Sequence, residues 1–108
     1  MYNNTGNNNK AIEFHEKALE FRKQSLGPNH VDVAKSLNNL GNVFKKTGNY
    51  DKAIELYEKA LEIRKQSLGA NHVNVATSLN NLGNVFYKTG NYDKAIEFNE
   101  KALEIQKQ

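Results

Sequence analysis

The sequence predicts an all-α fold, an α-solenoid of five helices stacked as antiparallel hairpins. Internal similarity is the first observation, because residues 7–48 and residues 49–90 are two copies of one 42-residue segment that differ at nine positions. The second is apolar residues spaced three and four apart, the pattern of amphipathic helices. The third is a short break with glycine after each such pattern. Repeats of this kind bury their apolar faces against each other, so one continuous core is expected.

The best-defined hairpin covers residues 31–68. In its first helix Leu37, Leu40 and Phe44 lie at helical intervals and make one apolar stripe. The second helix carries its own stripe of Ala53, Ile54, Tyr57, Ala60 and Leu61. Between the helices, the segment Thr47-Gly48-Asn49 offers a glycine that tolerates the left-handed conformation and an asparagine that can cap the next helix. A short, tight turn is therefore expected.

Gly41 interrupts the first apolar stripe of this hairpin. Glycine in a helix interior costs about 1 kcal/mol relative to alanine, so a packing reason for it is expected. Ala53, on the second helix, is also small. We predict that Gly41 and Ala53 let the two helices approach each other closely.

The hairpin resembles the tetratricopeptide repeat (TPR) signature. The residues that carry the resemblance are Leu37, Leu40, Gly41, Phe44, Gly48, Tyr50, Ala53, Tyr57 and Ala60. The TPR proline expected near Lys65 is missing, and the second helix continues to Gly69, which lengthens the unit. The linkers at residues 26–40 and 68–82 each end in a Leu-Asn-Asn-Leu run and are similar to the long repeats of kinesin light chains. The resemblance implies a TPR superhelix.

A single domain over residues 1–108 is expected. Residues 1–9 are rich in asparagine, which prefers turns and caps to helix interiors, so they are expected to be a frayed lead-in. A half repeat at 10–30 and two repeats at 31–72 and 73–108 follow. The helices are expected at Lys10–Leu26, Val31–Lys46, Tyr50–Leu68, Val73–Lys88 and Tyr92–Lys107. The helices at 31–46 and 73–88, each of which opens a hairpin, are called first-type helices below. The other three are called second-type helices.

Composition excludes several classes of protein. The chain has no cysteine, and hence no disulfide framework, thiol nucleophile or cysteine metal site. No apolar run approaches the roughly 20 residues that cross a bilayer. The first residues are rich in asparagine and do not form a basic and then apolar signal segment. A soluble, cytoplasmic protein that makes no membrane contact is therefore expected.

The net charge of +3 lies on the first-type helices. These two helices carry Lys35, Lys45, Lys46 and Lys88 against the single acid Asp32, while basic and acidic residues balance in the rest of the chain. The second-type helices instead carry opposite charges four residues apart, which is typical of a solvated face. These pairs are Glu13/Lys17, Glu55/Lys59 and Glu97/Lys101.

The resemblance implies that first-type helices line a concave groove that takes an extended peptide. The groove positions in this sequence would be Lys35, Asn38, Asn42, Lys45, Lys46, Thr77, Asn80, Asn84, Tyr87 and Lys88. An asparagine amide has two donor hydrogens and an acceptor oxygen, so it can pair with the backbone of an extended peptide. Lysines beside these amides would favour carboxylates. A protein-interaction scaffold that binds an extended, acidic peptide is the function that this pattern favours.

Alternatives to peptide binding stay open. Repeated asparagines also stitch neighbouring helices together, and lysines on helices are often simply solvated. The complete carboxylate clamp of chaperone adaptors is not expected, because Asn38 and Asn80 replace the lysine of that clamp. Two of the nine differences between the copies, Lys35 against Thr77 and Lys45 against Tyr87, fall on groove positions and favour tuning for a ligand.

A second reading is a structural or self-assembling repeat, a natural fragment or a consensus-type design, with no dedicated ligand. The helix at 10–26 lacks the partner that would normally precede it, so Ile12, Phe14 and Phe21 would be partly exposed. Apolar residues exposed at the ends of the array would support self-association. The sequence leaves this alternative open.

No catalytic residue, metal site or cofactor is predicted. His30 and His72 recur one repeat apart at helix starts, but no second ligand or nucleophile recurs with them, so capping or packing is expected. Ser36 and Ser78 have no Asp/His pair nearby and no strand-to-helix elbow. Nucleic acid is not the expected partner, because four lysines spread over two helices give only a modest phosphate-binding patch.

Overall fold

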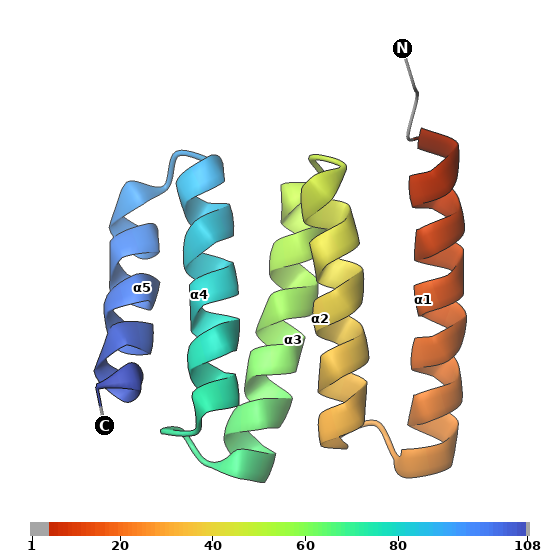
Figure 1. The fold of residues 1–108 in the computed structure, drawn as a ribbon, viewed down its shortest axis with the longest axis horizontal. Helices are drawn as coiled ribbons and strands as arrows, with labels where there is room; N and C mark the ends of the chain where they lie inside the picture. The colour runs from red at the N-terminus through yellow and green to blue at the C-terminus, as the bar shows by residue number, and fades with distance from the viewer. Residues whose placement is uncertain (1–4, 108) are drawn as a thin grey trace.

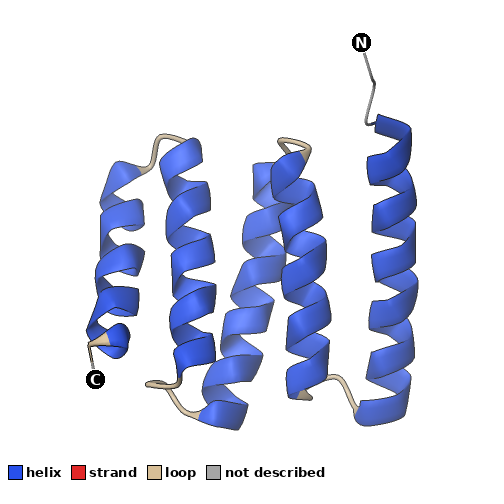
Figure 2. Cartoon of the chain, viewed as in Figure 1, coloured by secondary structure: helices blue, strands red, loops and turns tan. Residues whose placement is uncertain are grey.

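The computed structural model describes residues 5–107, which form five helices and no strand (Figure 2). The helices are α1 (Thr5–Leu26), α2 (Val31–Lys46), α3 (Tyr50–Leu68), α4 (Val73–Lys88) and α5 (Tyr92–Gln106). Each helix packs on the next one in the chain. They form a row with α1 at one end and α5 at the other, measuring 41 × 37 × 18 Å (Figure 1). The predicted all-α solenoid of five helices is confirmed.

Helix ends are set by side chains close in sequence. The Nδ1 atom of His30 accepts a hydrogen bond of 3.0 Å from the Asp32 backbone N–H, and the equivalent bond to His72 is also 3.0 Å long. The capping role predicted for both histidines is confirmed. At the predicted turn, Gly48 has a φ of +85°, and the Asn49 side chain accepts from the Lys52 backbone N–H. The turn therefore forms as its residues predict.

The first helix starts at Thr5 rather than at Lys10. Residues 5–9 of the expected lead-in are helical, while residues 1–4 lie outside the described residues. Thr5-Gly6-Asn7 has the same sequence as the turn Thr47-Gly48-Asn49. Each residue added to an existing helix gains a backbone hydrogen bond, and low propensity costs only about 0.7 kcal/mol for ordinary residues. The asparagines therefore do not stop α1. The division into repeats stays a prediction.

The core runs along the row without a break. One buried cluster joins α1, α2 and α3 through residues that include Leu19, Leu37 and Ile63. Phe44 packs against this cluster and also against the next one, which contains Tyr57 and Leu82. Neighbouring helices thus share apolar faces, as expected for stacked repeats.

Gly41 makes room for an aromatic ring rather than for Ala53. A Cβ atom added at Gly41 would lie 2.8 Å from Cε1 of Tyr57, whose side chain is completely buried. Ala53 belongs instead to the cluster that contains Leu82 and Val85 of α4. The predicted close approach is real, but the contact that Gly41 permits is with Tyr57. Tyr57 is large, so the packing benefit of the glycine exceeds its helix cost.

A repeated arginine–serine contact joins α1 to α2 and α3 to α4. The Nη1 atom of Arg64 donates to Ser78 Oγ at 2.9 Å and to the Asn74 carbonyl at 3.4 Å. Arg22 makes the equivalent bond of 2.7 Å to Ser36 Oγ. Burial lowers the pKa of the Arg64 guanidinium from its usual value. Ser36 and Ser78 are therefore structural residues, a role that the sequence analysis did not foresee.

Replacing Gly41 with alanine is expected to destabilise the fold by about 1–3 kcal/mol, because the buried Tyr57 ring has no space to move. Gly83→Ala is the matched control. Its added Cβ would lie 2.7 Å from Cγ of Asn99 and closer still to Oδ1, but Asn99 is only partly buried, so this short side chain can rotate toward solvent more easily than the Tyr57 ring. Urea unfolding of both variants measures the difference. An equal loss in both would contradict the role assigned to Tyr57.

Ser78→Ala is expected to cost about 1–3 kcal/mol, because it leaves the Arg64 guanidinium without one of its partners. Ser36→Ala, the same change one repeat earlier, is expected to cost less, since Arg22 is more exposed and water can replace the lost partner. Thermal unfolding of the two variants tests this order. The reverse order would show that burial of the arginine does not set the cost.

Candidate functional site

All ten residues predicted to line the groove lie on α2 and α4, and each is at least partly exposed. Four of them come together. Asn42, Lys45 and Lys46 from the end of α2 and Lys88 from the end of α4 line a hollow of about 420 Å³. The fifth lining residue is Tyr50, the first residue of α3. This set of five residues is called the three-lysine hollow below.

Tyr50 was missed as a site residue because it belongs to a second-type helix. The resemblance places only first-type helices on the groove, and Tyr50 was assigned to the repeat signature instead. The signal that could have found it is its position directly after the turn at Asn49, beside the end of α2. A residue at the start of a second-type helix lies at the same end of the hairpin as the last turn of the preceding first-type helix.

The amide of Asn42 is oriented by the core. Its Oδ1 atom accepts a hydrogen bond from the Tyr57 hydroxyl, and the Tyr57 ring is fully buried. Burial raises the pKa of Tyr57 to about 12, so the hydroxyl stays protonated and donates at neutral pH. With its oxygen occupied, Asn42 has its two Nδ2 hydrogens left for other partners. The residue therefore acts mainly as a donor at the hollow.

Asn38 is committed to a contact between helices. Its Oδ1 atom accepts a hydrogen bond of 2.6 Å from Nδ2 of Asn81, which links α2 directly to α4. Stitching of neighbouring helices, the alternative reading of these asparagines, is therefore correct for this pair. Asn38 is half-buried and retains only its own amide hydrogens for a ligand.

The remaining predicted groove residues are not gathered into one site. Lys35 is exposed in the first half of α2, and Asn84 is exposed on α4. Thr77 donates its hydroxyl to the Val73 carbonyl, within its own helix. Tyr87 packs edge-on against Tyr92, with ring centroids 5.3 Å apart. Asn80 is half-buried.

The lysines of the hollow differ from the lysines of the second-type helices. The predicted pairs Glu13/Lys17, Glu55/Lys59 and Glu97/Lys101 form, with N to O distances of 3.1, 3.5 and 3.2 Å. Within residues 5–107 no salt bridge involves Lys45, Lys46 or Lys88. Their charges are therefore available to an external anion.

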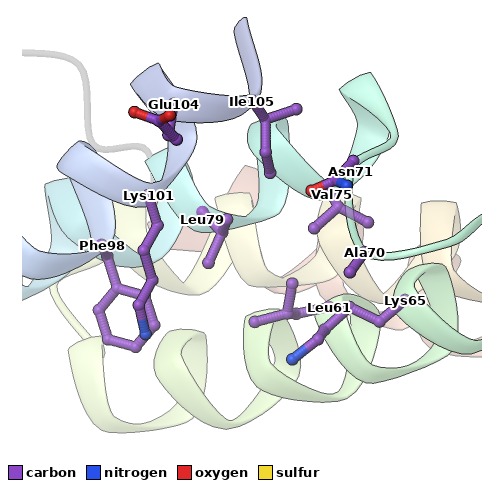
Figure 3. Close-up of a pocket in the computed structure, with 10 residues that line it drawn as sticks. All are labelled: Leu61, Lys65, Ala70, Asn71, Val75, Leu79, Phe98, Lys101, Glu104 and Ile105. Carbon is purple, nitrogen blue, oxygen red and sulfur yellow. The ribbon is translucent and has the colours of Figure 1, made fainter. Parts of the chain in front are cut away.

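A second kind of pocket occurs twice, one repeat apart. The first has a volume of about 370 Å³ between α3, α4 and α5, and Leu61, Leu79 and Ile105 point into it (Figure 3). Its counterpart of about 440 Å³ includes the equivalent residues Leu37 and Ile63. Both have a mixed rim of lysine and glutamate side chains. Their floors are apolar, unlike that of the three-lysine hollow.

Residues 5–107 contain neither a candidate metal-binding cluster nor a helix that could span a membrane. No three His, Asp or Glu side chains in this range are grouped so that they could hold a metal ion. None of the helices is both long and apolar enough to cross a membrane.

Family comparison agrees with the repeat pattern. Residues 1–66 and residues 32–108 each match the family model described as tetratricopeptide repeat. The chain belongs to the tetratricopeptide repeat family. No similarity to a curated protein was found. The assignment rests on both halves of the chain, so it does not depend on a single repeat.

Solved TPR structures have the same fold. The crystal structure of BtubC (BKLC) from P. vanneervenii is 33% identical in sequence and superimposes with a TM-score of 0.88. The match covers 94% of this TPR chain and 40% of the BtubC chain. A putative kinesin light chain from Podosopora anserina, described as having nearly identical TPR-like repeats, is 23% identical. The match covers 95% of this chain and 49% of the Podosopora anserina chain, with a TM-score of 0.84. The chain thus spans less than half the length of these relatives.

The buried hydroxyl of Tyr57 is expected to make this TPR domain sensitive to alkaline pH. An unfolded tyrosine ionises near pH 10, whereas the folded Tyr57 ionises at about 12. Between these values the unfolded chain loses the proton first, so the free energy of unfolding falls as pH rises from 10 to 12, by about 2–3 kcal/mol.

Tyr57→Phe should remove this part of the pH dependence, at the cost of the hydrogen bond to Asn42. Tyr87→Phe is the control, because its ring is 63% exposed. Urea unfolding at pH 8 and at pH 11 measures both variants against the parent. Parallel pH profiles for the parent and Tyr57→Phe would contradict the prediction.

Proposed function

We propose that this TPR domain is a non-catalytic, cytoplasmic interaction scaffold that binds an extended, acidic peptide along α2 and α4. The observation that carries the proposal is the three-lysine hollow, where lysines from both first-type helices meet beside an oriented asparagine amide. TPR folds generally serve as protein-interaction scaffolds, and this chain belongs to that family.

Preorganisation supports this function. The Asn38–Asn81 hydrogen bond ties α2 to α4, and the Tyr57–Asn42 hydrogen bond fixes an amide on the same surface. A peptide that binds there loses its own conformational freedom, while the protein has already lost its freedom on folding. The exposed amide of Asn84 and the half-buried amide of Asn80 can pair with the peptide backbone, and the lysines with its acidic side chains.

Self-assembly without a dedicated ligand is a second candidate. Phe14 and Phe21 on α1 are 69% and 70% exposed, although the equivalent Leu56 and Ile63 on α3 are buried. At the other end, Ile96 and Leu103 of α5 are 58% and 50% exposed. Apolar residues exposed at both ends of the row favour contacts with other chains. A molecular mass that rises with protein concentration is the signature of this candidate.

Selection from a random peptide display library tests the first candidate. The library is applied to the parent, to Lys45→Gln/Lys46→Gln/Lys88→Gln, and to the control Lys10→Gln/Lys23→Gln/Lys65→Gln, which loses the same charge on second-type helices. Acidic peptides are expected to enrich on the parent and the control, and enrichment is expected to fall at least tenfold on the hollow variant. Circular dichroism first confirms that all three proteins are folded.

Either of two results would overturn the groove proposal. One is the absence of any enriched peptide on the parent. The other is enrichment of the same peptides on the parent and on the hollow variant. In both cases self-assembly becomes the leading function.

A further inference from the structure

We propose that the three-lysine hollow binds a phosphoryl group carried by a side chain of the bound peptide. This proposal rests on the proposed function and deepens it, because it names the chemical class of the side chain that the hollow selects. A phosphorylated serine or threonine residue is the occupant to which the proposal commits.

The polar side chains that line the hollow are suited to donate hydrogen bonds. Lys45, Lys46 and Lys88 carry ammonium groups, which have three donor hydrogens each and no acceptor. Asn42 contributes Nδ2, because its oxygen is occupied by the Tyr57 hydroxyl. The Tyr50 hydroxyl can also donate. A group that has several acceptor oxygens and no donor fits such a lining.

Charge favours a phosphoryl group over a carboxylate. A phosphoserine carries about −1.5 to −2 charges at pH 7 and three strong acceptor oxygens, against one charge and two oxygens for Asp or Glu. Three lysines line the hollow, and no salt bridge within residues 5–107 neutralises their charges. One carboxylate would leave more positive charge uncompensated. The hollow volume of about 420 Å³ also has room for the side chain that carries the group.

Other hollows of the molecule show the contrast. Glu104 lines the pocket between α3, α4 and α5, and Glu62 lines its counterpart one repeat earlier. A shallow depression on α5 is lined by Asp93, Ile96, Glu97, Glu100, Lys101 and Glu104. Each of these would repel a phosphoryl group through at least one carboxylate. The three-lysine hollow has no acid among its lining residues.

The second repeat does not reproduce the site. Tyr87 stands where the first repeat has Lys45, and Asn99 stands where it has Tyr57. The amide of Asn84 therefore lacks the buried hydroxyl that orients Asn42. The features that suit a phosphoryl group occur together only at the junction of α2, α3 and α4 within residues 5–107.

Titration with small probes tests the site without requiring a peptide ligand. The probes are N-acetyl-phosphoserine N-methylamide, its serine and aspartate analogues, and inorganic phosphate, each added to the ¹⁵N-labelled full chain at pH 7. The phosphoserine probe is expected to shift the Asn42 side-chain amide signals and to bind at least tenfold more tightly than the aspartate probe. Lys45→Gln/Lys88→Gln should weaken this binding at least tenfold, and Lys23→Gln/Lys65→Gln should weaken it less than twofold.

Three outcomes would overturn the proposal. Equal binding of the aspartate and phosphoserine probes would show that any anion suffices. Equal binding of inorganic phosphate would show that the hollow does not recognise a group borne by a side chain. Shifts that persist in Lys45→Gln/Lys88→Gln would place the anion elsewhere.

Failure of the groove proposal has a different signature. If the phosphoserine probe binds in the hollow but no library peptide enriches on the parent, the phosphoryl site stands and the peptide groove does not. If acidic peptides enrich but the phosphoserine probe does not bind, the groove stands and the phosphoryl site does not.

Discussion

The Tyr57 side chain is the constraint on which the core and the candidate site both depend. Its ring is completely buried, packs over Gly41 of α2 and belongs to the cluster that includes Leu82 of α4. The same side chain therefore holds its own hairpin together and joins it to the next one. Its buried hydroxyl donates a hydrogen bond to Asn42, which is exposed, and sets the direction of that amide. A change in core packing at this position would be felt directly at the three-lysine hollow.

Polar contacts in the inner repeats fix the position of one helix along its neighbour, which apolar packing alone does not determine. Helices that share broad, similar apolar faces can shift along one another at little cost. The Arg64–Ser78 and Asn38–Asn81 hydrogen bonds fix the position of α4 against α3 and α2. The outermost copies replace the Tyr57 position with His15 and Asn99, which are more polar. The polar residues thus occur on α1 and α5, the two outer helices of the described row.

Local sequence signals predicted the helices well because their causes are local. The caps at His30 and Asn49 and the left-handed Gly48 act within a few residues, so four helix starts and their turns followed from the sequence. The start of α1 did not, because the low helix propensity of the asparagines at residues 7–9 costs little once a helix is formed. The particular partners of Asn38, Asn42 and Arg64 were beyond reach, since each lies ten or more residues away.

The candidate site was predicted as a surface rather than as a hollow for a related reason. The resemblance to TPR arrays assigns residues to the groove face of the first-type helices, and it named four of the five lining residues in that way. The hollow forms only where the end of one first-type helix, the start of the next second-type helix and the following first-type helix meet. It therefore belongs to a junction between repeats. Lys45 and its counterpart Tyr87 differ in chemistry, as do Tyr57 and its counterpart Asn99. Near-identical repeats can in this way carry one distinct site, because a few of their differences fall on residues that line or orient the hollow.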